Sequence, residues 1–475
     1  MKTNLVSIFA LLILLAIGCK SLNTNLSLPE KKIPESYHTV SADSTTIAKI
    51  NWREYFDDTN LIKLIDTALA GNLDLLMTLQ RIEVARAGTR SAKGALLPQA
   101  GVNISGGVRK FGLYTMDGAG NISTEILPGK IVPINLPDMY VGLNASWEAD
   151  IWGKLQNKRK SAQASYLASI EGANCVISNL VADVAISYYE LIALDNELEI
   201  IRQTIQKQQE ALDVIKLKKE TGRVNELAVQ QFQAQVLNSQ ALEFEFKQQI
   251  LEQENRINFL LGRYPQTIQR SQEALFKDIP QKFASGIPSQ LLANRPDIRE
   301  AELQVTASKF DLKAAKAAFF PSINITSGIG FQAFNPQFLF ISPASLAYST
   351  LGGLVAPLVN MNALKAHFHT AKSNQLTAMY NYQKTILNGY VEVANELSSL
   401  ENLNQISLLK RQQREVLVQS VEISTELYKS VKVNYLEVLV AQQNLLQTQL
   451  DVITVKKRQL ISTVTIYKAL GGGWR

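Results

Sequence analysis

Apolar residues recur at alternating spacings of three and four along the middle of the chain. In the first half of this stretch they are Ile177, Leu180, Val184, Leu191, Leu194, Leu198, Ile201 and Ile205, with one gap at Ser187. This heptad pattern is typical of a helix packed in a coiled coil. After Thr221-Gly222-Arg223 the pattern resumes at Leu227, Phe232, Leu237, Leu242, Phe246, Leu251 and Leu260. The stretch therefore predicts a hairpin of two helices, each of about 40 residues and about 60 Å, which suits a rod that spans distance.

A period of two replaces the helical period on both sides of a Gly- and Pro-rich segment, residues 111–138. The apolar residues that alternate with small polar ones are Val102, Ile104, Val108, Val141, Leu143, Ala145 and Trp147. The alternation predicts strands at residues 100–110 and 139–148. Such strands suit either a globular sheet with one wet face or a membrane barrel with lipid outside and water inside. The segment between them is too long for a tight hairpin and fits the long outer loops of outer-membrane barrels.

The chain carries this sequence of elements twice. The first unit, residues 51–286, has shorter helices that end at Pro98, then the two strands, then the long helices over residues 155–262. The second unit covers residues 287–475. It has a helix from Ser289 to Phe320, strands at 322–331 and 346–355, and long helices over 362–470. Val224-Asn225 recurs as Val433-Asn434, and Leu261-Gly262 recurs as Leu470-Gly471, both at an offset of 209 residues. Two copies of one structural unit therefore fill the chain.

Four strands are too few to close a membrane barrel, because the small ones use about eight. Open strand edges do not occur in lipid, since their N–H and C=O groups would have no water to bond. Several chains must therefore contribute strands to one barrel. The fold class predicted is an α+β membrane protein with an internal two-fold repeat.

The N-terminal segment has the order of a secretory signal. Lys2 is followed by an apolar run from Leu5 to Leu15 and by Ala16-Ile17-Gly18-Cys19. This pattern predicts a signal peptide over residues 1–18. The small residues before Cys19 resemble a bacterial lipobox, which implies cleavage before Cys19 and its acylation; the alternative is an ordinary signal peptide with an incidental cysteine. Residues 19–50, rich in Ser, Thr, Asn and Pro, are expected to form a lipidated tether.

Composition excludes several function classes. The net charge of +6 is modest for 475 residues, and no Lys/Arg cluster with interleaved aromatics predicts nucleic-acid binding. Of the three histidines, His367 and His369 are two apart on a predicted helix and point to different faces. We identify no catalytic residue, no metal site and no cofactor other than the covalent lipid on Cys19. Cys175, within a helical run, is expected to pack in the core.

Several motifs together carry a resemblance to a known family. They are Trp52 to Phe56, Trp147-Glu148-Ala149-Asp150-Ile151-Trp152-Gly153, Arg295-Pro296-Asp297-Ile298-Arg299-Glu300-Ala301-Glu302, Tyr435-Leu436-Glu437-Val438-Leu439 and Ala469-Leu470-Gly471-Gly472-Gly473-Trp474. With the lipobox-like Cys19, these motifs cover nearly the whole mature chain. In this combination and order the chain resembles the TolC-like outer-membrane efflux proteins, in their lipoprotein branch.

The resemblance implies a homotrimer with a 12-stranded outer-membrane barrel, four strands per chain, continuous with a periplasmic helical barrel. It implies three kinds of partner: outer-membrane lipid, a periplasmic adaptor protein and an inner-membrane pump of the RND type. The chain would passively conduct drugs or other small toxic compounds that the pump selects. Heavy-metal efflux of the copper or silver type and a type I secretion duct stay open within the family. A non-transporting envelope scaffold is the third alternative.

In the family, the tips of the long hairpins close the tunnel and meet the adaptor. The corresponding candidate gate residues are Arg223, Glu226, Lys432, Val433 and Glu437. Val431, Val433 and Val440 depart from the family pattern, which more often has a Gly or an acidic residue at these places. Glu437 is the remaining candidate for an acidic ring, the alternative being an exposed helix charge. Arg295, Asp297, Arg299 and Glu302 at a helix start, and Asp150 at a strand-to-helix junction, are expected to have structural roles.

Overall fold

The computed structural model describes residues 24, 26–27, 32–37, 46–276, 285–357, 359, 361–430 and 432–475. The predicted signal peptide, Cys19 and most of the tether lie outside these residues. The chain divides into two compact units. Among the described residues, the strand unit comprises 24, 26–27 and those within Val84–Leu167 and Leu303–Met379, and the helical unit comprises 32–37, 46–83 and those within Ala168–Glu302 and Tyr380–Arg475.

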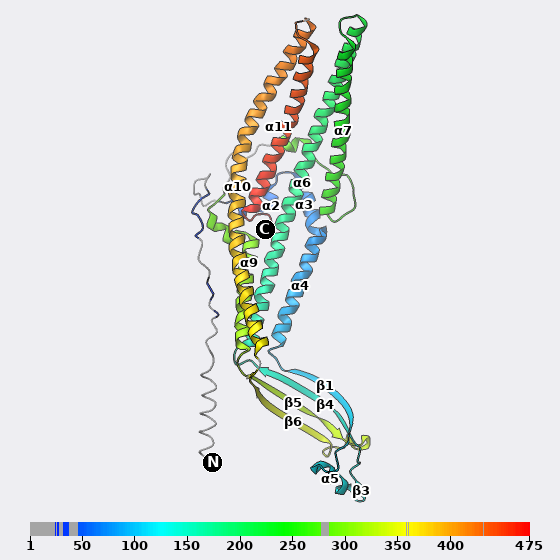
Figure 1. Cartoon of the computed structure of the whole chain (residues 1–475), viewed down its shortest axis with the longest axis vertical. Helices are drawn as coiled ribbons and strands as arrows, with labels where there is room; N and C mark the ends of the chain where they lie inside the picture. Colours follow the sequence, from blue (N-terminus) through cyan, green and yellow to red (C-terminus); the bar gives the residue numbers. More distant parts are fainter. Residues whose placement is uncertain are drawn as a thin grey trace. The chain divides into compact units, whose positions relative to one another are not determined.

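The strand unit contains a four-stranded antiparallel sheet in the order β1-β4-β5-β6 (Figure 1). Its strands are β1 (Gln99–Arg109), β4 (Leu136–Ala149), β5 (Ser322–Ala333) and β6 (Leu346–Val355). The register places apolar residues opposite one another, because Leu143 pairs with both Val102 and Ile329. One residue along, Gly142 pairs with Asn103 and Gly330. The period of two thus produces one apolar face and one face of small and polar residues.

The two outer strands have free edges within the described part of the chain. β1 pairs only with β4, and β6 pairs only with β5. Every residue of β1 is exposed, including the large side chains of Val102 and Ile104. A row of unpaired backbone groups beside exposed apolar side chains is a template for another strand.

The connection from β1 to β4 is more ordered than the sequence indicates. It contains α5 (Met116–Ser123) and a small hairpin of β2 (Glu125–Leu127) and β3 (Lys130–Ile131). The Thr115 hydroxyl caps α5 by accepting from the Gly118 N–H at 3.1 Å and donating to the Gly112 carbonyl at 2.7 Å. These short elements are held by local hydrogen bonds and not by burial of one apolar face. The sequence of the connection therefore shows no hydrophobic periodicity that would predict them.

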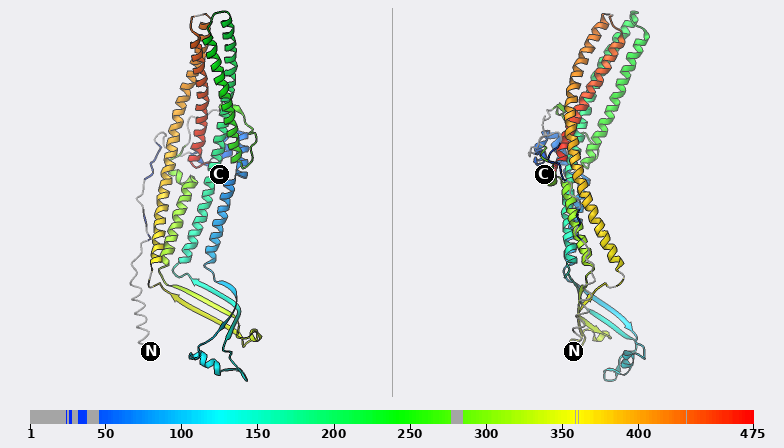
Figure 2. Two further views of the ribbon diagram at one scale, coloured as in Figure 1. Left: turned by 45° about the vertical axis from the view of Figure 1, so that its right-hand side comes forward. Right: turned by 60° about the vertical axis from the view of Figure 1, so that its left-hand side comes forward.

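The helical unit contains the larger part of two long hairpins. One consists of α6 (Lys154–Glu220) and α7 (Glu226–Leu260), and the other of α10 (Asn362–Lys429) and α11 (Tyr435–Ala469). Of these, α6 and α10 begin in the strand unit. The helices lie side by side in the order α7, α6, α11, α10 (Figures 1 and 2). Polar contacts join each neighbouring pair: Arg202 to Glu243, Thr454 to Glu197, and Lys410 to Asp451.

The heptad residues of α6 form the centre of the core. Leu180, Val184, Leu191, Leu194, Leu198 and Ile201 are all buried. The gap in the pattern, Ser187, is also fully buried. The core also includes Leu61 and Ile65 from α3 (Thr59–Gly71) and Trp52 from α2 (Trp52–Tyr55). α4 (Leu73–Gly94) follows α3 after a break at Asn72.

One sequence expectation about the helices holds in part and another is wrong. Of the apolar residues in the pattern predicted for α7, Phe232 is buried, whereas Leu227, Leu237 and Leu251 are exposed. The buried residues of α7 also include Val229, Val236 and Ser239. The second unit's first helix is also interrupted. A turn at Pro288–Gln290 and α8 (Leu291–Asn294) precede α9 (Pro296–Ala317), because Arg295 is extended before a proline.

Among the described residues, one helix, α6, contains an 18-residue window apolar enough to cross a membrane. Of that window, 56% is buried inside the protein, as in the core helix of a water-exposed domain. The window therefore gives little support for a helical membrane span.

The two faces of the sheet should differ in their tolerance of charge. Ile325 lies on the apolar face, where it pairs with Trp147 and Gly352. Lysine at Ile325 should cost about 2–4 kcal/mol at mid-bilayer, whereas lysine at the neighbouring Asn324 should cost little. Yields of assembled protein in outer membranes measure the difference. Equal yields for the two variants would favour a sheet with no lipid-facing side.

Candidate functional site

The first hairpin tip is a tight turn between α6 and α7. Gly222 has a positive φ of 70°, and the N–H groups of Gly222 and Arg223 donate to the carbonyls of Lys219 and Lys218, both at 2.9 Å. This is the Schellman pattern that ends many helices. Asn225 then caps α7 by accepting from the Ala228 N–H at 3.2 Å. The turn Thr221-Gly222-Arg223 is thus built by a C-cap and an N-cap in immediate succession.

The second tip repeats this arrangement between α10 and α11. The Lys432 N–H donates to the Leu427 carbonyl at 2.9 Å, as Arg223 does to Lys218. Asn434 occupies the cap position before α11, but its side chain makes no capping hydrogen bond. The recurrence of Val-Asn at an offset of 209 residues therefore reflects two turns of similar shape.

The tips of one chain pack against each other through a tip cluster of apolar side chains. Its buried members are Leu212, Ile215, Ala228, Val229, Phe232 and Val236. Tyr428, Tyr435 and Leu439 of the second hairpin pack against it, with the Phe232 and Tyr435 ring centroids 6.4 Å apart. The Lys218 ammonium also lies 4.0 Å from the centroid of the Tyr428 ring. The two hairpin tips of a chain are therefore held together.

The five candidate gate residues all lie on these tips. Glu226 forms an ion pair with Lys219 of its own hairpin and accepts a hydrogen bond from Gln230 at 2.7 Å. The hydrogen bond from Lys219 lowers the pKa of the Glu226 carboxyl. Arg223, Lys432 and Glu437 are exposed and Val433 is half-buried. In the part of the chain that the structure describes, no ion pair joins the candidate charges of the two tips.

Sequence analysis therefore missed the actual partner of Glu226. Lys219 and Glu226 are seven residues apart across the turn, a spacing that becomes informative only when the turn geometry is known. The Lys218–Tyr428 contact joins two segments far apart in sequence and left no local signal. Pairing of Arg223 and Lys432 with Glu226 and Glu437 between hairpins, around a three-fold axis, is a further prediction from the sequence and stays a prediction.

Arg295 is the centre of a structural network in the helical unit. Its guanidinium donates two hydrogen bonds to the Asp297 carboxylate, at 3.0 and 2.8 Å, and others to Glu392 at 2.8 Å and the Ala469 carbonyl at 2.7 Å. Hydrogen bonds and attraction from these two carboxylates outweigh desolvation and raise the pKa of Arg295. Arg299 pairs with the buried Glu171 at 2.6 Å. The Arg-Pro-Asp-Ile-Arg motif thus ties the start of α9 to α6, α10 and α11.

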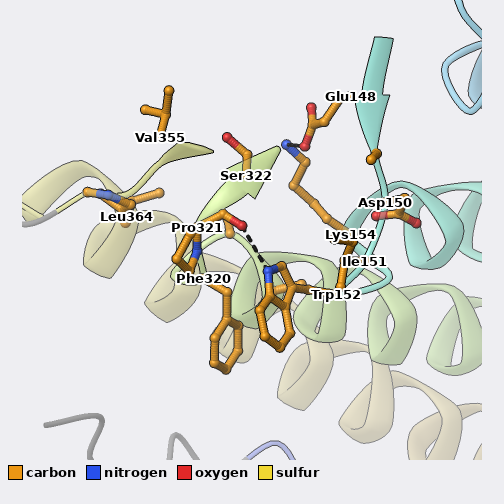
Figure 3. Close-up of a pocket in the computed structure, with 14 residues that line it drawn as sticks. Glu148, Asp150, Ile151, Trp152, Lys154, Phe320, Pro321, Ser322, Val355 and Leu364 are labelled. Atoms are coloured by element: carbon orange, nitrogen blue, oxygen red, sulfur yellow. Dashed lines mark hydrogen bonds and ion pairs between the residues drawn. The ribbon is translucent and has the colours of Figure 1, made fainter. Parts of the chain in front are cut away.

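The strand-to-helix junction of the strand unit holds a cavity of about 300 Å³ (Figure 3). Asp150 caps α6 by accepting from the Leu155 and Gln156 N–H groups at 2.9 and 2.7 Å. Trp152 stacks on Phe320, with ring centroids 4.9 Å apart, and donates to the Pro321 carbonyl at 2.8 Å. Asp150 and Trp152 both make contacts that connect a strand to a helix, so the motif from Trp147 to Gly153 has a structural role here.

The remaining candidates are one cysteine and two histidines. Cys175 is half-buried, and burial raises the pKa of its thiol. His367 and His369 are exposed on α10. Within the described residues, no group of three His, Cys, Asp or Glu side chains is placed to hold a metal ion.

The model of one protein family, outer membrane efflux protein, matches residues 64–263 and 287–472. This chain belongs to that family. The efflux protein is 29% identical to the probable outer membrane lipoprotein SilC of Salmonella typhimurium, over 100% of this chain and 99% of SilC. It is also 29% identical to the solvent efflux pump outer membrane protein SrpC of Pseudomonas putida, over 100% and 99% of the two chains.

A solved structure of CusC has the same fold as this efflux protein. The TM-score is 0.80 at 26% identity, over 94% of this chain and 99% of CusC. The efflux protein is therefore an outer-membrane channel component of an efflux system, and its family works with an adaptor and an inner-membrane pump. The resemblance inferred from the sequence motifs is confirmed.

Proposed function

We propose that three copies of this efflux protein form one passive duct, with a 12-stranded barrel in the outer membrane and a ring of 12 long helices in the periplasm. The observation that carries the proposal is that both the sheet and the row of long helices end in unpaired edges. β1 and β6 expose backbone groups that need strands in lipid. Four strands per chain, taken three times, give a closed barrel.

The outer helices of the row present matching apolar edges. On α7, Leu237, Phe244 and Leu251 are exposed at seven-residue steps. On α10, Leu409, Val416 and Ile423 are exposed at the same step. Each stripe lies about a third of a turn from the face that packs within the chain, at about 100° per residue. A helix in a closed ring needs two such faces, one for each neighbour, which supports contact between α7 of one copy and α10 of the next.

We assign the choice of cargo to the pump. Relatives at the same 29% identity bear names for cation efflux and for solvent efflux, so identity alone favours neither cargo. A wide water-filled bore selects weakly by itself. We infer that the partners are a periplasmic adaptor and an RND-type inner-membrane pump, and that drugs or other small toxic compounds are the cargo. Conductance of the purified protein in planar bilayers tests the duct, and a protein that inserts without conducting would overturn it.

The gate residues provide a prediction of changed conductance. Around a three-fold axis each tip residue is present three times, so weak ion pairs of about 0–1 kcal/mol can together bias one aperture. The double variant Glu437→Gln with Arg223→Ser should raise single-channel conductance, and Val433→Asp should increase cation selectivity. A matched control is Glu401→Gln with Arg414→Ser, two exposed charges of α10 that lie well before the end of the helix at Lys429. Tip variants that behave like this control would show that the five residues do not line the gate.

We also propose that Cys19 carries the covalent lipid. Cys19→Ser should abolish incorporation of a labelled fatty acid, because the thiol is the acylated group. Labelling of the variant at the wild-type level would contradict this assignment.

A further inference from the structure

Two polar side chains are buried in the α6–α7 hairpin without hydrogen-bond partners. Gln208 of α6 is 2% exposed, and neither its amide nitrogen nor its amide oxygen has a partner. Ser239 of α7 is 0% exposed, and its hydroxyl is also unpartnered. We call Gln208 and Ser239 the polar layer.

The polar layer lies at one level of the hairpin. The ion pairs Lys219–Glu226 and Arg202–Glu243 both cross between α6 and α7, so each pair marks two residues at the same level of the hairpin. Because the two helices are antiparallel, residue numbers at one level have a constant sum, and each of these pairs gives 445. The numbers of Gln208 and Ser239 add to 447, which places them within one turn of the same level. On the tip side of this level are Leu212 and Val236 of the tip cluster. On the other side are the buried heptad residues Leu198 and Ile201.

Unpartnered buried polar atoms occur in several parts of the chain, Ser187 Oγ of α6 among them, and three more lie in the same part of the helical unit as the polar layer. Among the described residues these three are Gln231 Oε1, Tyr428 Oη and Gln442 Oε1. All of these atoms are already covered within a single chain, so contact with a second copy cannot supply their partners. A buried polar group without a hydrogen bond raises the free energy of the conformation that buries it. Any opening that admits water to the group lowers that cost.

We propose that the polar layer is the point at which the tip parts from the rest of the helical unit, and that it sets the balance between closed and open tips. The apolar tip cluster holds the hairpins together beyond this level, while the heptad core holds α6 within the helical unit before it. Parting of α6 and α7 at Gln208 hydrates the amide and leaves the core packing intact. The consequence for conductance rests on the proposed function, whereas the local opening itself does not.

Hydrogen–deuterium exchange of the purified full-length protein tests this inference. Gln208→Leu replaces the unpartnered amide with the leucine that the heptad pattern would place there. Exchange of backbone amides in residues 209–239 should slow by about fivefold or more. The local opening that exposes these backbone N–H groups is less favourable when it no longer hydrates a buried side-chain amide. Ser239→Ala should also slow this backbone exchange. It is the alternative variant if Gln208→Leu folds poorly. Single-channel open probability should fall in parallel.

Gln375→Leu is the matched control. Gln375 lies on α10 in the strand unit, is 3% exposed and has an unpartnered amide oxygen, so its replacement should leave exchange of residues 209–239 unchanged. Wild-type exchange rates at the tip in both Gln208→Leu and Ser239→Ala would overturn the inference, as would equal slowing by Gln375→Leu. Slowed exchange with no conductance in any variant, the wild type included, would retain the polar layer and reject the duct.

Discussion

Replacing Arg295 by alanine should prevent most of the protein from reaching an assembled, detergent-stable form. The side chain is 11% exposed and its guanidinium joins Asp297, Glu392 and the Ala469 carbonyl. Its removal leaves Asp297 without its cation, leaves Glu392 with Lys468 alone at 4.0 Å, and leaves an unpaired carbonyl at the end of α11. Breaking a buried ion pair by removing one partner costs about 3–5 kcal/mol. The thermal midpoint of the purified protein and its yield in outer membranes measure the loss.

Arg53→Ala is the control for this prediction. Arg53 also forms an ion pair, with Asp66, but the two side chains are 55% and 45% exposed. An exposed pair contributes about 0–1 kcal/mol, so this variant should keep a midpoint close to the wild type. Equal midpoints for the Arg295 and Arg53 variants would contradict a structural role for the Arg-Pro-Asp-Ile-Arg motif.

Glutamate at Phe244 should separate the copies of the efflux protein. Phe244 is 69% exposed in the single chain and sits at the centre of the α7 stripe. In a closed ring it is covered by the next copy, where burial of a carboxylate costs about 3 kcal/mol per seam. Lys247, whose ammonium lies 5.0 Å from the centroid of the Phe244 ring, offsets only part of this cost because it already pairs with Glu243. A ring of three copies contains three such contacts between α7 and α10, and each carries the defect. The detergent-extracted particle should therefore have the mass of fewer than three chains. Native mass spectrometry measures the change.

A repair variant makes this prediction specific. Phe244 lies 18 residues from the start of α7, and Leu409 lies 20 residues from the end of α10, so the two are at similar distances from the tips. Phe244→Glu with Leu409→Lys should recover part of the association by pairing opposite charges across the seam. Asn238→Glu, at an exposed position about a third of a turn from the stripe, should leave the mass unchanged. Loss of association in Asn238→Glu, or none in Phe244→Glu, would contradict the seam.

Much of the architecture follows from periodicity in the sequence. The buried residues of α6 repeat at heptad spacing, and the alternation in β4 and β5 matches a register that places Leu143 opposite Ile329. Such patterns are visible because burial of one face selects residue types at fixed intervals. The apolar residues predicted for α7 are divided between two stripes, one buried and one exposed, and the spacing in the sequence does not distinguish the two.

The candidate site was less accessible from the sequence. The residues from Thr221 to Asn225 predict where the first turn lies, but the hydrogen-bond and ion-pair partners of the tip residues depend on tertiary geometry. The Lys219–Glu226 pair crosses a turn, and Lys218 reaches Tyr428 on the other hairpin. Gln208 shows the limit in a different way. Gln208 continues the heptad spacing of α6, which predicts a position facing the core, but glutamine is also common on exposed helix surfaces, so the residue type does not show that it is buried.

The mass of the full-length particle extracted in detergent tests the central claim most directly, namely that one chain supplies a third of a closed duct. Native mass spectrometry should find three chains per particle, because four strands with two free edges and four long helices with two apolar edges close only by repetition. A folded, stable single chain would contradict the account, since it would leave both strand edges and both helix stripes without partners.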